Sequence, residues 1–131
     1  TTALEDGEII AEIRVPETPA KAGWSYQKLA NRASRFAVVG VAALVTVAKD
    51  GTCARVRVGV TGAGPSPFRA HGTERYLSGK PLTEETIAKA AQRATNGVDF
   101  LGDVHGSPAY REHLTAELTK RAITQAMERA S

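Results

Sequence analysis

The sequence predicts an α+β fold, in which a small three-stranded antiparallel sheet is followed by a bundle of about three helices packed on one face of the sheet. Apolar segments with the patterns typical of strands lie in the first half of the chain. An Asp-Gly turn joins two of these segments. Helix-start signals, each followed by apolar residues at helical spacing, lie in the second half.

The composition indicates one globular domain of ordinary size, spanning residues 1–131. The chain is 42% hydrophobic and 24% charged, which is normal for a soluble domain. Its net charge is +3, and because the charges are interspersed we expect a solvated surface and no nucleic-acid partner. No apolar run reaches the roughly 18 residues that a membrane span needs. The single Cys53 excludes an internal disulfide and, with no signal peptide in the sequence, favours a reducing, cytoplasmic location.

The first strand is predicted over residues 8–15. Ile9, Ala11, Ile13 and Val15 recur there with a period of two, with Glu12 and Arg14 between them, and Pro16 ends the segment. Residues 16–23 contain two prolines and form a polar loop. Residues 24–32 are either a short turn of helix or an irregular crossing segment, which Trp24 and Leu29 are expected to anchor.

A hairpin is predicted over residues 36–60. Residues 36–48 are apolar at nearly every position, which suits a strand covered on both faces or a buried helix. The Asp50-Gly51 pair that follows is a hairpin-turn signal and favours the strand. In the next segment Val56, Val58 and Val60 alternate with arginine and glycine, which predicts a strand with one face in water.

Three helices are predicted in the second half of the chain. A short helix over residues 70–77 stops before Gly79, and a second helix begins after an N-cap at Thr83 and ends at Asn96-Gly97. Residues 98–106 form a loop in which Val98, Phe100 and Leu101 are expected to be buried. The Ser107-Pro108 pair starts a last helix that runs towards Arg129. Apolar residues at helical spacing are Ile87, Ala90, Ala91 and Ala94 in the second helix, and Tyr110, Leu114, Leu118 and Ala122 in the last.

The residues predict no catalytic site and no metal site. His71, His105 and His113 lack metal-ligand spacing, and Cys53 is expected to be a small packed or half-exposed side chain. Asp99, Asp103 and His105 could form a ligand or acid–base set, but a polar loop that caps the next helix is favoured.

The glycine-rich stretch after the hairpin is predicted to be a tight crossing. Gly59, Gly62 and Gly64 allow a phosphate-loop interpretation, but Pro65 and Pro67 remove backbone donors that a phosphate cradle uses. Arg69 is expected to hold this turn through backbone carbonyls.

Four blocks of sequence carry a family resemblance: residues 8–16; residues 25–29 with 32–43; residues 61–70 with Glu74 and Leu77; and residues 107–111 with Leu114, Leu118, Arg121 and Ala122. In this order they resemble the C-terminal domain of the FAD-binding (medium) subunit of molybdenum hydroxylases, of the carbon monoxide dehydrogenase flavoprotein type. Together they span nearly the whole chain.

The resemblance implies a part of an oxidoreductase complex, and no catalysis by this chain alone. In that family a molybdenum large subunit oxidises the substrate, and an iron–sulfur small subunit passes electrons to FAD on the medium subunit. The FAD phosphates lie mainly on N-terminal domains of the medium subunit. We therefore expect FAD in the full-length subunit, where the FAD-binding N-terminal region is a partner of this domain, and no retention by this chain alone.

The resemblance also implies that this domain covers the ring side of the flavin, through Tyr26 and Lys28. A tyrosine can stack on the isoalloxazine, and a lysine can stabilise charge on the reduced ring. The alternatives are a Tyr26 that packs at the sheet edge and a Lys28 that is only solvated. For the whole chain, two further possibilities stay open. One is a free-standing protein-interaction module, and the other is nucleic-acid binding through Arg55 and Arg57, which the lack of aromatic residues on that face disfavours.

Overall fold

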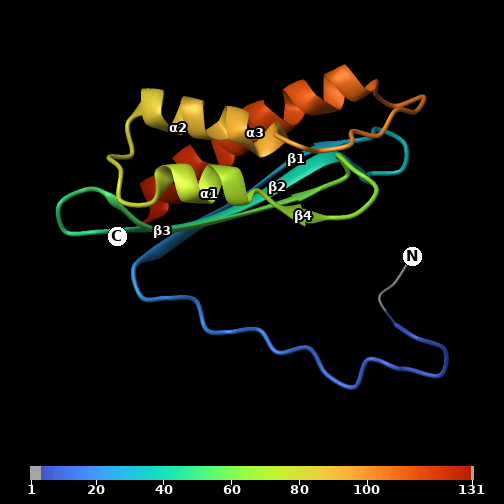
Figure 1. Ribbon diagram of the computed structural model, residues 1–131, viewed down its shortest axis with the longest axis horizontal. Coiled ribbons are helices and arrows are strands. Elements are labelled where there is room, and N and C mark those ends of the chain that lie inside the picture. Colours follow the sequence, from blue (N-terminus) through green and yellow to red (C-terminus); the bar gives the residue numbers. More distant parts are fainter. Residues whose placement is uncertain (1–3, 131) are drawn as a thin grey trace.

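The computed structural model describes residues 4–130. Its strands are β1 (Ala22–Ala30), β2 (Ala37–Val47), β3 (Cys53–Thr61) and β4 (Phe68–Arg69), and its helices are α1 (His71–Leu77), α2 (Glu84–Gln92), the 3-10 turn η1 (Arg93–Thr95) and α3 (Pro108–Arg129). The strands form one antiparallel sheet in the order β1-β2-β3-β4. The helices form a layer on one face of this sheet (Figure 1), so the predicted α+β class is confirmed.

The prediction of a first strand over residues 8–15 is wrong. These residues are extended but pair with no strand in residues 4–130, and they run outside the layered body (Figure 1). The four large apolar side chains of this segment, Ile9, Ile10, Ile13 and Val15, are 85%, 66%, 80% and 84% exposed. Alternation indicates that an extended chain has one apolar side, but it does not indicate which surface receives that side.

The sheet opens instead with β1, from the segment that the sequence left ambiguous. Trp24 does not anchor this segment, because it is 60% exposed, and Leu29 is exposed as well. The side of β1 that faces the helices begins with two small residues, Gly23 and Ser25, and continues with Gln27, whose side chain donates a hydrogen bond to Gln125 of α3. A β-carbon at Gly23 would lie 1.8 Å from the carbonyl oxygen of Ala126 in α3, so the helix packs directly on the strand backbone there.

The predicted β2–β3 hairpin is confirmed, which excludes a buried helix over residues 36–48. Val45 pairs with Val56 and Val41 pairs with Val60. At the turn, Gly51 has a φ of 81°, and the Asp50 carboxylate accepts hydrogen bonds from the Thr52 hydroxyl and backbone N–H at 2.7 and 3.0 Å. These bonds lower the pKa of Asp50.

The three predicted helices are also present, and local signals account for their ends. The hydroxyl of Thr83 accepts a hydrogen bond from the Thr86 N–H at the start of α2, and that of Ser107 accepts one from the Tyr110 N–H at the start of α3. Gly79, with a φ of 73°, follows the end of α1. In the loop before α3 the expected burial of Leu101 is wrong, because its side chain is exposed.

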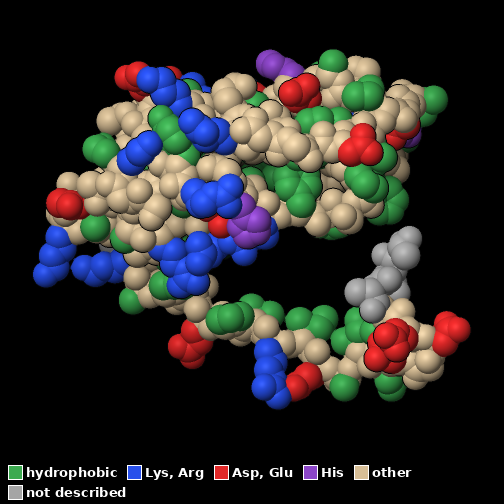
Figure 2. Space-filling model, in the orientation of Figure 1, with side chains coloured by type: hydrophobic (Ala, Val, Ile, Leu, Met, Phe, Trp, Pro, Cys, Tyr) green, Lys and Arg blue, Asp and Glu red, His purple; other side chains and the backbone are tan. Residues whose placement is uncertain are grey.

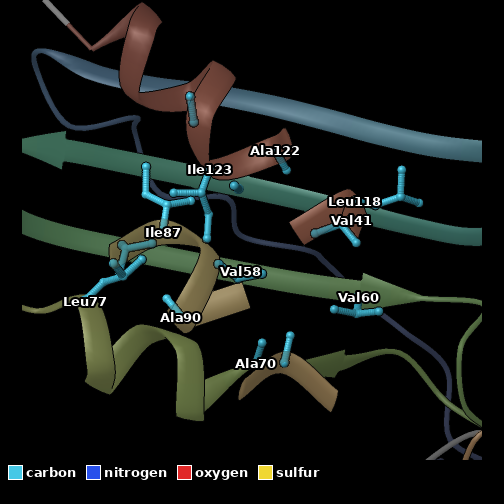
Figure 3. Packing of buried hydrophobic residues seen from close by; sticks show 14 of the residues in the cluster. Val41, Val58, Val60, Ala70, Leu77, Ile87, Ala90, Leu118, Ala122 and Ile123 are labelled. Atoms are coloured by element: carbon cyan, nitrogen blue, oxygen red, sulfur yellow. The ribbon is translucent and has the colours of Figure 1, made fainter. Parts of the chain in front are cut away.

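The core lies between the helices and the inner face of β2 and β3. Figure 3 shows Val41, Val58 and Val60 from the sheet facing Ile87, Leu118 and Ile123 from the helices. Cys53 is buried in the same cluster, and burial raises the pKa of its thiol, so the prediction of a packed structural cysteine is confirmed. This core leaves the opposite face of the sheet free of helices.

Candidate functional site

The candidate site lies on the outer face of the sheet, away from the helices. Tyr26 of β1 pairs with Ala42 of β2, Ala42 pairs with Gly59 of β3, and Gly59 pairs with Arg69 of β4. Paired residues in a sheet point to the same face. Two small residues therefore separate the Tyr26 side chain from the Arg69 side chain across the outer face.

These residues form a shallow cavity of about 410 Å³, which we name the outer trough. It is lined by Tyr26, Gly40, Ala42, Gly59, Val60, Thr61, Pro67, Phe68 and Arg69. A β-carbon at Gly59 would meet no atom within 4 Å, so the floor of the trough is open at this position. A flat floor between an aromatic side chain and a guanidinium group suits a planar ligand with polar edges.

Gly40 determines how Tyr26 lies on this face. A β-carbon at Gly40 would be 2.4 Å from the hydroxyl oxygen of Tyr26 and 3.1 Å from its Cζ. The tyrosine side chain can therefore lie across β2 only because residue 40 has no side chain. Tyr26 is half-exposed, and one wall of the outer trough is its ring.

Lys28 lies on the same face as Tyr26, two residues further along β1, but it does not line the trough. Its Nζ donates a hydrogen bond to the carbonyl oxygen of Arg35 at 3.3 Å. Arg35 has a φ of 63°, in a loop where the Asn31 carboxamide oxygen accepts bonds from the N–H groups of Ala33 and Ser34. The structure therefore brings the two predicted site residues to one face and places only Tyr26 at the cavity.

Arg69 does not hold the Gly/Pro turn through backbone carbonyls, as the sequence suggested. Its guanidinium donates to the Glu74 carboxylate at 2.6–2.8 Å, and the same carboxylate accepts the backbone N–H of Val58 at 2.9 Å. Glu74 is buried, and its carboxylate accepts hydrogen bonds both from this backbone N–H of β3 and from the Arg69 side chain, so its own polar atoms have partners. Arg69 is drawn to this carboxylate because a charged acceptor forms a stronger hydrogen bond than a carbonyl does.

Arg111 makes the backbone contacts that were expected of Arg69. Its side chain is only 4% exposed and donates to the carbonyl oxygens of Val38 and Gly62. A β-carbon at Gly62 would lie 2.8 Å from the Val38 carbonyl oxygen, and Gly62 has a φ of 77°. The glycine stretch thus passes close to β2. This supports the interpretation as a tight crossing and not the interpretation as a phosphate loop.

The polar residues before α3 act as a structural loop. Asp103 accepts two hydrogen bonds from Arg111, both at 2.7 Å, and one from the His105 N–H, and these contacts lower the pKa of its carboxyl group. His105 Nδ1 lies 2.9 Å from the Asn31 amide nitrogen. Within residues 4–130, no group of three or more His, Cys, Asp or Glu side chains could hold a metal ion.

Comparison with known proteins assigns the family of this domain. Residues 24–126 match the family model described as the CO dehydrogenase flavoprotein C-terminal domain. The chain belongs to this family. The match includes the outer trough and both residues of β1, Tyr26 and Lys28, that the resemblance singled out.

The relatives are longer proteins. The chain is 34% identical to the 6-hydroxypseudooxynicotine dehydrogenase complex subunit alpha of Paenarthrobacter nicotinovorans, over 98% of this chain and 44% of the relative. It is 32% identical to the carbon monoxide dehydrogenase medium chain of Hydrogenophaga pseudoflava, over 99% of this chain and 45% of the relative. The chain therefore spans less than half the length of these curated relatives.

Solved structures share the whole fold. A structure of the Hydrogenophaga pseudoflava carbon monoxide dehydrogenase, which lacks the Mo-pyranopterin moiety of its cofactor, matches 100% of this chain and 45% of its own with a TM-score of 0.94 at 32% identity. A relative from Escherichia coli O157:H7, 26% identical over 98% of this chain and 44% of its own length, is named xanthine dehydrogenase FAD-binding subunit.

Among the helices described here, none has the length and apolar character needed to cross a bilayer.

Proposed function

We propose that this chain acts as the C-terminal domain of the FAD-binding subunit of a molybdenum-hydroxylase-type oxidoreductase, where it covers the ring side of the flavin. The observation that carries the proposal is the outer trough, a shallow cavity beside Tyr26 in a domain of the flavoprotein family. FAD, when bound, supplies a group that accepts electrons and passes them to an acceptor. This domain supplies the surface that receives the flavin ring.

The residues of the trough fit a planar ring better than they fit a phosphate chain. Gly40, Ala42 and Gly59 make a floor without bulky side chains. The glycine stretch that could have formed a phosphate cradle lies against Val38 instead, and Pro65 lacks an N–H. The FAD phosphates would then be held by the N-terminal region of the full-length subunit, and this chain alone would not retain FAD.

Tyr26 and Lys28 would have different roles. The Tyr26 ring would cover a face of the flavin, and its hydroxyl, which lies over Gly40, would meet a polar edge. Lys28 is tied to the Arg35 carbonyl oxygen by a hydrogen bond of 3.3 Å. From this position its ammonium group would stabilise negative charge on the reduced ring without blocking the trough.

The extended segment before β1 would bind the FAD-binding N-terminal region of the same subunit. Ile9, Ile10, Ile13 and Val15 are all exposed, and residues 8–15 pair with no strand of the described domain. The carbon monoxide dehydrogenase structure matches this chain over its whole length at a TM-score of 0.94, and the match is 45% of the longer chain. The segment thus belongs to the shared fold, and the longer relatives contain further chain that could cover it.

In the complex, electrons would reach the flavin from an iron–sulfur small subunit, and a molybdenum large subunit would oxidise the substrate. Substrate contacts would lie on the large subunit. The second candidate is a free-standing interaction module, favoured by the exposed apolar side chains of Phe36 and Val104. A role in flavin chemistry distinguishes the two candidates.

Replacement of Tyr26 tests the proposal directly. In the full-length subunit loaded with FAD, Tyr26→Ala should change flavin fluorescence and slow flavin reduction in the assembled complex, because the ring loses its stacking partner. Stopped-flow absorbance and steady-state fluorescence would measure both effects. Tyr110→Ala is the matched control, since Tyr110 is 45% exposed against 49% for Tyr26 but lies at the start of α3. If both variants behave like the wild type, the proposed stacking of Tyr26 on the flavin is wrong.

A further inference from the structure

A concentration of positive charge surrounds α1 and borders the outer trough, with which it shares Arg69. One groove of about 810 Å³ lies between α1 and η1 and includes Arg69, Arg75, Lys80 and Arg93 in its lining. A second cavity of about 340 Å³ lies between α1 and β3 and includes Arg55, Arg57 and Arg75. Figure 2 shows the Lys and Arg side chains gathered over this part of the molecule. We name the six residues Arg55, Arg57, Arg69, Arg75, Lys80 and Arg93 the basic patch.

The patch has too few carboxylates to neutralise it. Only Glu74 and Asp99 occur in the linings of the two cavities. The buried Glu74 is already shared, with Arg69 at 2.6 Å, His71 at 3.5 Å and Arg57 at 3.8 Å. The charge of six cations and two carboxylates is more positive than the net charge of +3 of the whole chain. The fold therefore brings together, on one surface, positive charges that are dispersed along the sequence.

Four of the six cations are free to bind an anion. No acceptor in residues 4–130 forms a hydrogen bond or ion pair with the side-chain nitrogens of Arg55, Arg75, Lys80 or Arg93, whereas Arg57 and Arg69 contact Glu74. Lys80 Nζ lies 3.5 Å and the Arg93 guanidinium carbon lies 4.4 Å from the centre of the Tyr76 ring. Contact with the ring restrains the guanidinium while its N–H donors stay available, which suits recognition of carboxylates.

We propose that the basic patch binds an acidic protein surface, rich in Asp and Glu, on a partner subunit of the same complex. This inference rests on the proposed function, which supplies the partner subunits. The cations lie on both sides of α1 and over two cavities, an extent that a protein surface can cover and a compact ligand cannot. Nucleic acid is less suited, because the Tyr76 ring is occupied by two cations and cannot stack on a base.

Charge reversal in the full-length flavoprotein subunit tests this inference. The subunit would be mixed with its large and small subunits, and the dissociation constant would be measured at several NaCl concentrations. Arg75→Glu and Arg93→Glu should each weaken assembly by about tenfold or more at low salt and reduce its salt dependence, because the attraction is electrostatic. Arg121→Glu is the matched control, an equal change of charge at an exposed arginine of α3.

The outcomes separate this inference from the proposed function. A loss of subunit affinity in both patch variants, with FAD content and flavin reduction rate of the free subunit unchanged, supports the basic patch as the docking surface. Wild-type affinity in both variants, or an equal loss in Arg121→Glu, overturns it while the proposed function stands. Double-stranded DNA that binds the wild-type chain at 150 mM NaCl as tightly as the partner subunits do, and not the patch variants, also overturns it. If the wild-type subunit binds neither FAD nor the partner subunits, both proposals fail.

Discussion

Gly40 and Gly59 shape the outer trough through the side chains that they lack. Gly40 leaves the space that the Tyr26 hydroxyl occupies, and Gly59 leaves the centre of the floor empty. Neither glycine has a positive φ, so neither is required by the backbone conformation. Glycine in the interior of a strand lowers stability relative to β-branched residues. The Tyr26 hydroxyl accounts for the glycine at position 40, whereas the open space at Gly59 is better explained by the proposed flavin site than by the stability of the sheet.

Gly59→Val separates stability from flavin binding. The new side chain enters open space in a strand, so the free energy of unfolding of the chain should rise by about 0.5–1 kcal/mol. In the full-length subunit the same substitution fills the floor of the trough and should lower FAD content and slow flavin reduction. Urea denaturation and the ratio of flavin to protein absorbance would measure the two effects. Ala54→Val, at an exposed position of the same strand outside the trough, is the control.

Elements whose ends are set by local chemistry could be predicted from the sequence. Thr83 and Ser107 cap α2 and α3 through their own hydroxyl groups, and the β2–β3 turn is held by Asp50 and Gly51. β1 could not be predicted, because its larger side chains are exposed and Gly23 faces the helices. Only the position of α3, about 100 residues later in the chain, explains that inverted pattern.

The attachment of α3 to the sheet predicts a dependence on pH. Arg111, and then the His105 N–H, lower the pKa of the Asp103 carboxyl group below its usual value of 3.8. A carboxyl group with a lowered pKa in the folded state stabilises the fold above its unfolded pKa, and this stabilisation is lost as the pH falls through the folded value.

Asp103→Asn should therefore lower the thermal unfolding temperature at pH 7, where the wild type holds an ionised carboxylate against Arg111. The difference between variant and wild type should shrink as the pH falls below 3.8. Circular dichroism melts between pH 7 and pH 2.5 would show the effect. A difference that stays constant over this range would mean that the charge of Asp103 does not hold α3. Asp99→Asn, at an exposed carboxyl group of the same loop, is the control.

At the scale of the whole molecule, the predictable features are those that follow from patterns within one segment of the chain. The α+β class and the helical core follow from periodicity, whereas the trough depends on the register of four strands and the basic patch on the folding of residues 55–93 around α1. Tyr26 and Lys28 entered through the family resemblance, since nothing in their spacing marks a flavin site. The strand predicted over residues 8–15 failed because its apolar side contacts nothing in this domain.

Residues 8–15 support a prediction that compares this chain with the full-length subunit. Replacing Ile9, Ile13 and Val15 together by serine should leave the thermal unfolding of this chain unchanged, because these side chains contribute nothing to its core. In the full-length subunit the same triple variant should lose FAD and become sensitive to limited proteolysis near residue 16, because the apolar side would no longer be buried against the FAD-binding region. Glu12→Ser with Arg14→Ser, on the other side of the segment, should have little effect in either protein. A triple variant that keeps its FAD and its protease resistance would show that the segment does not bind the N-terminal region.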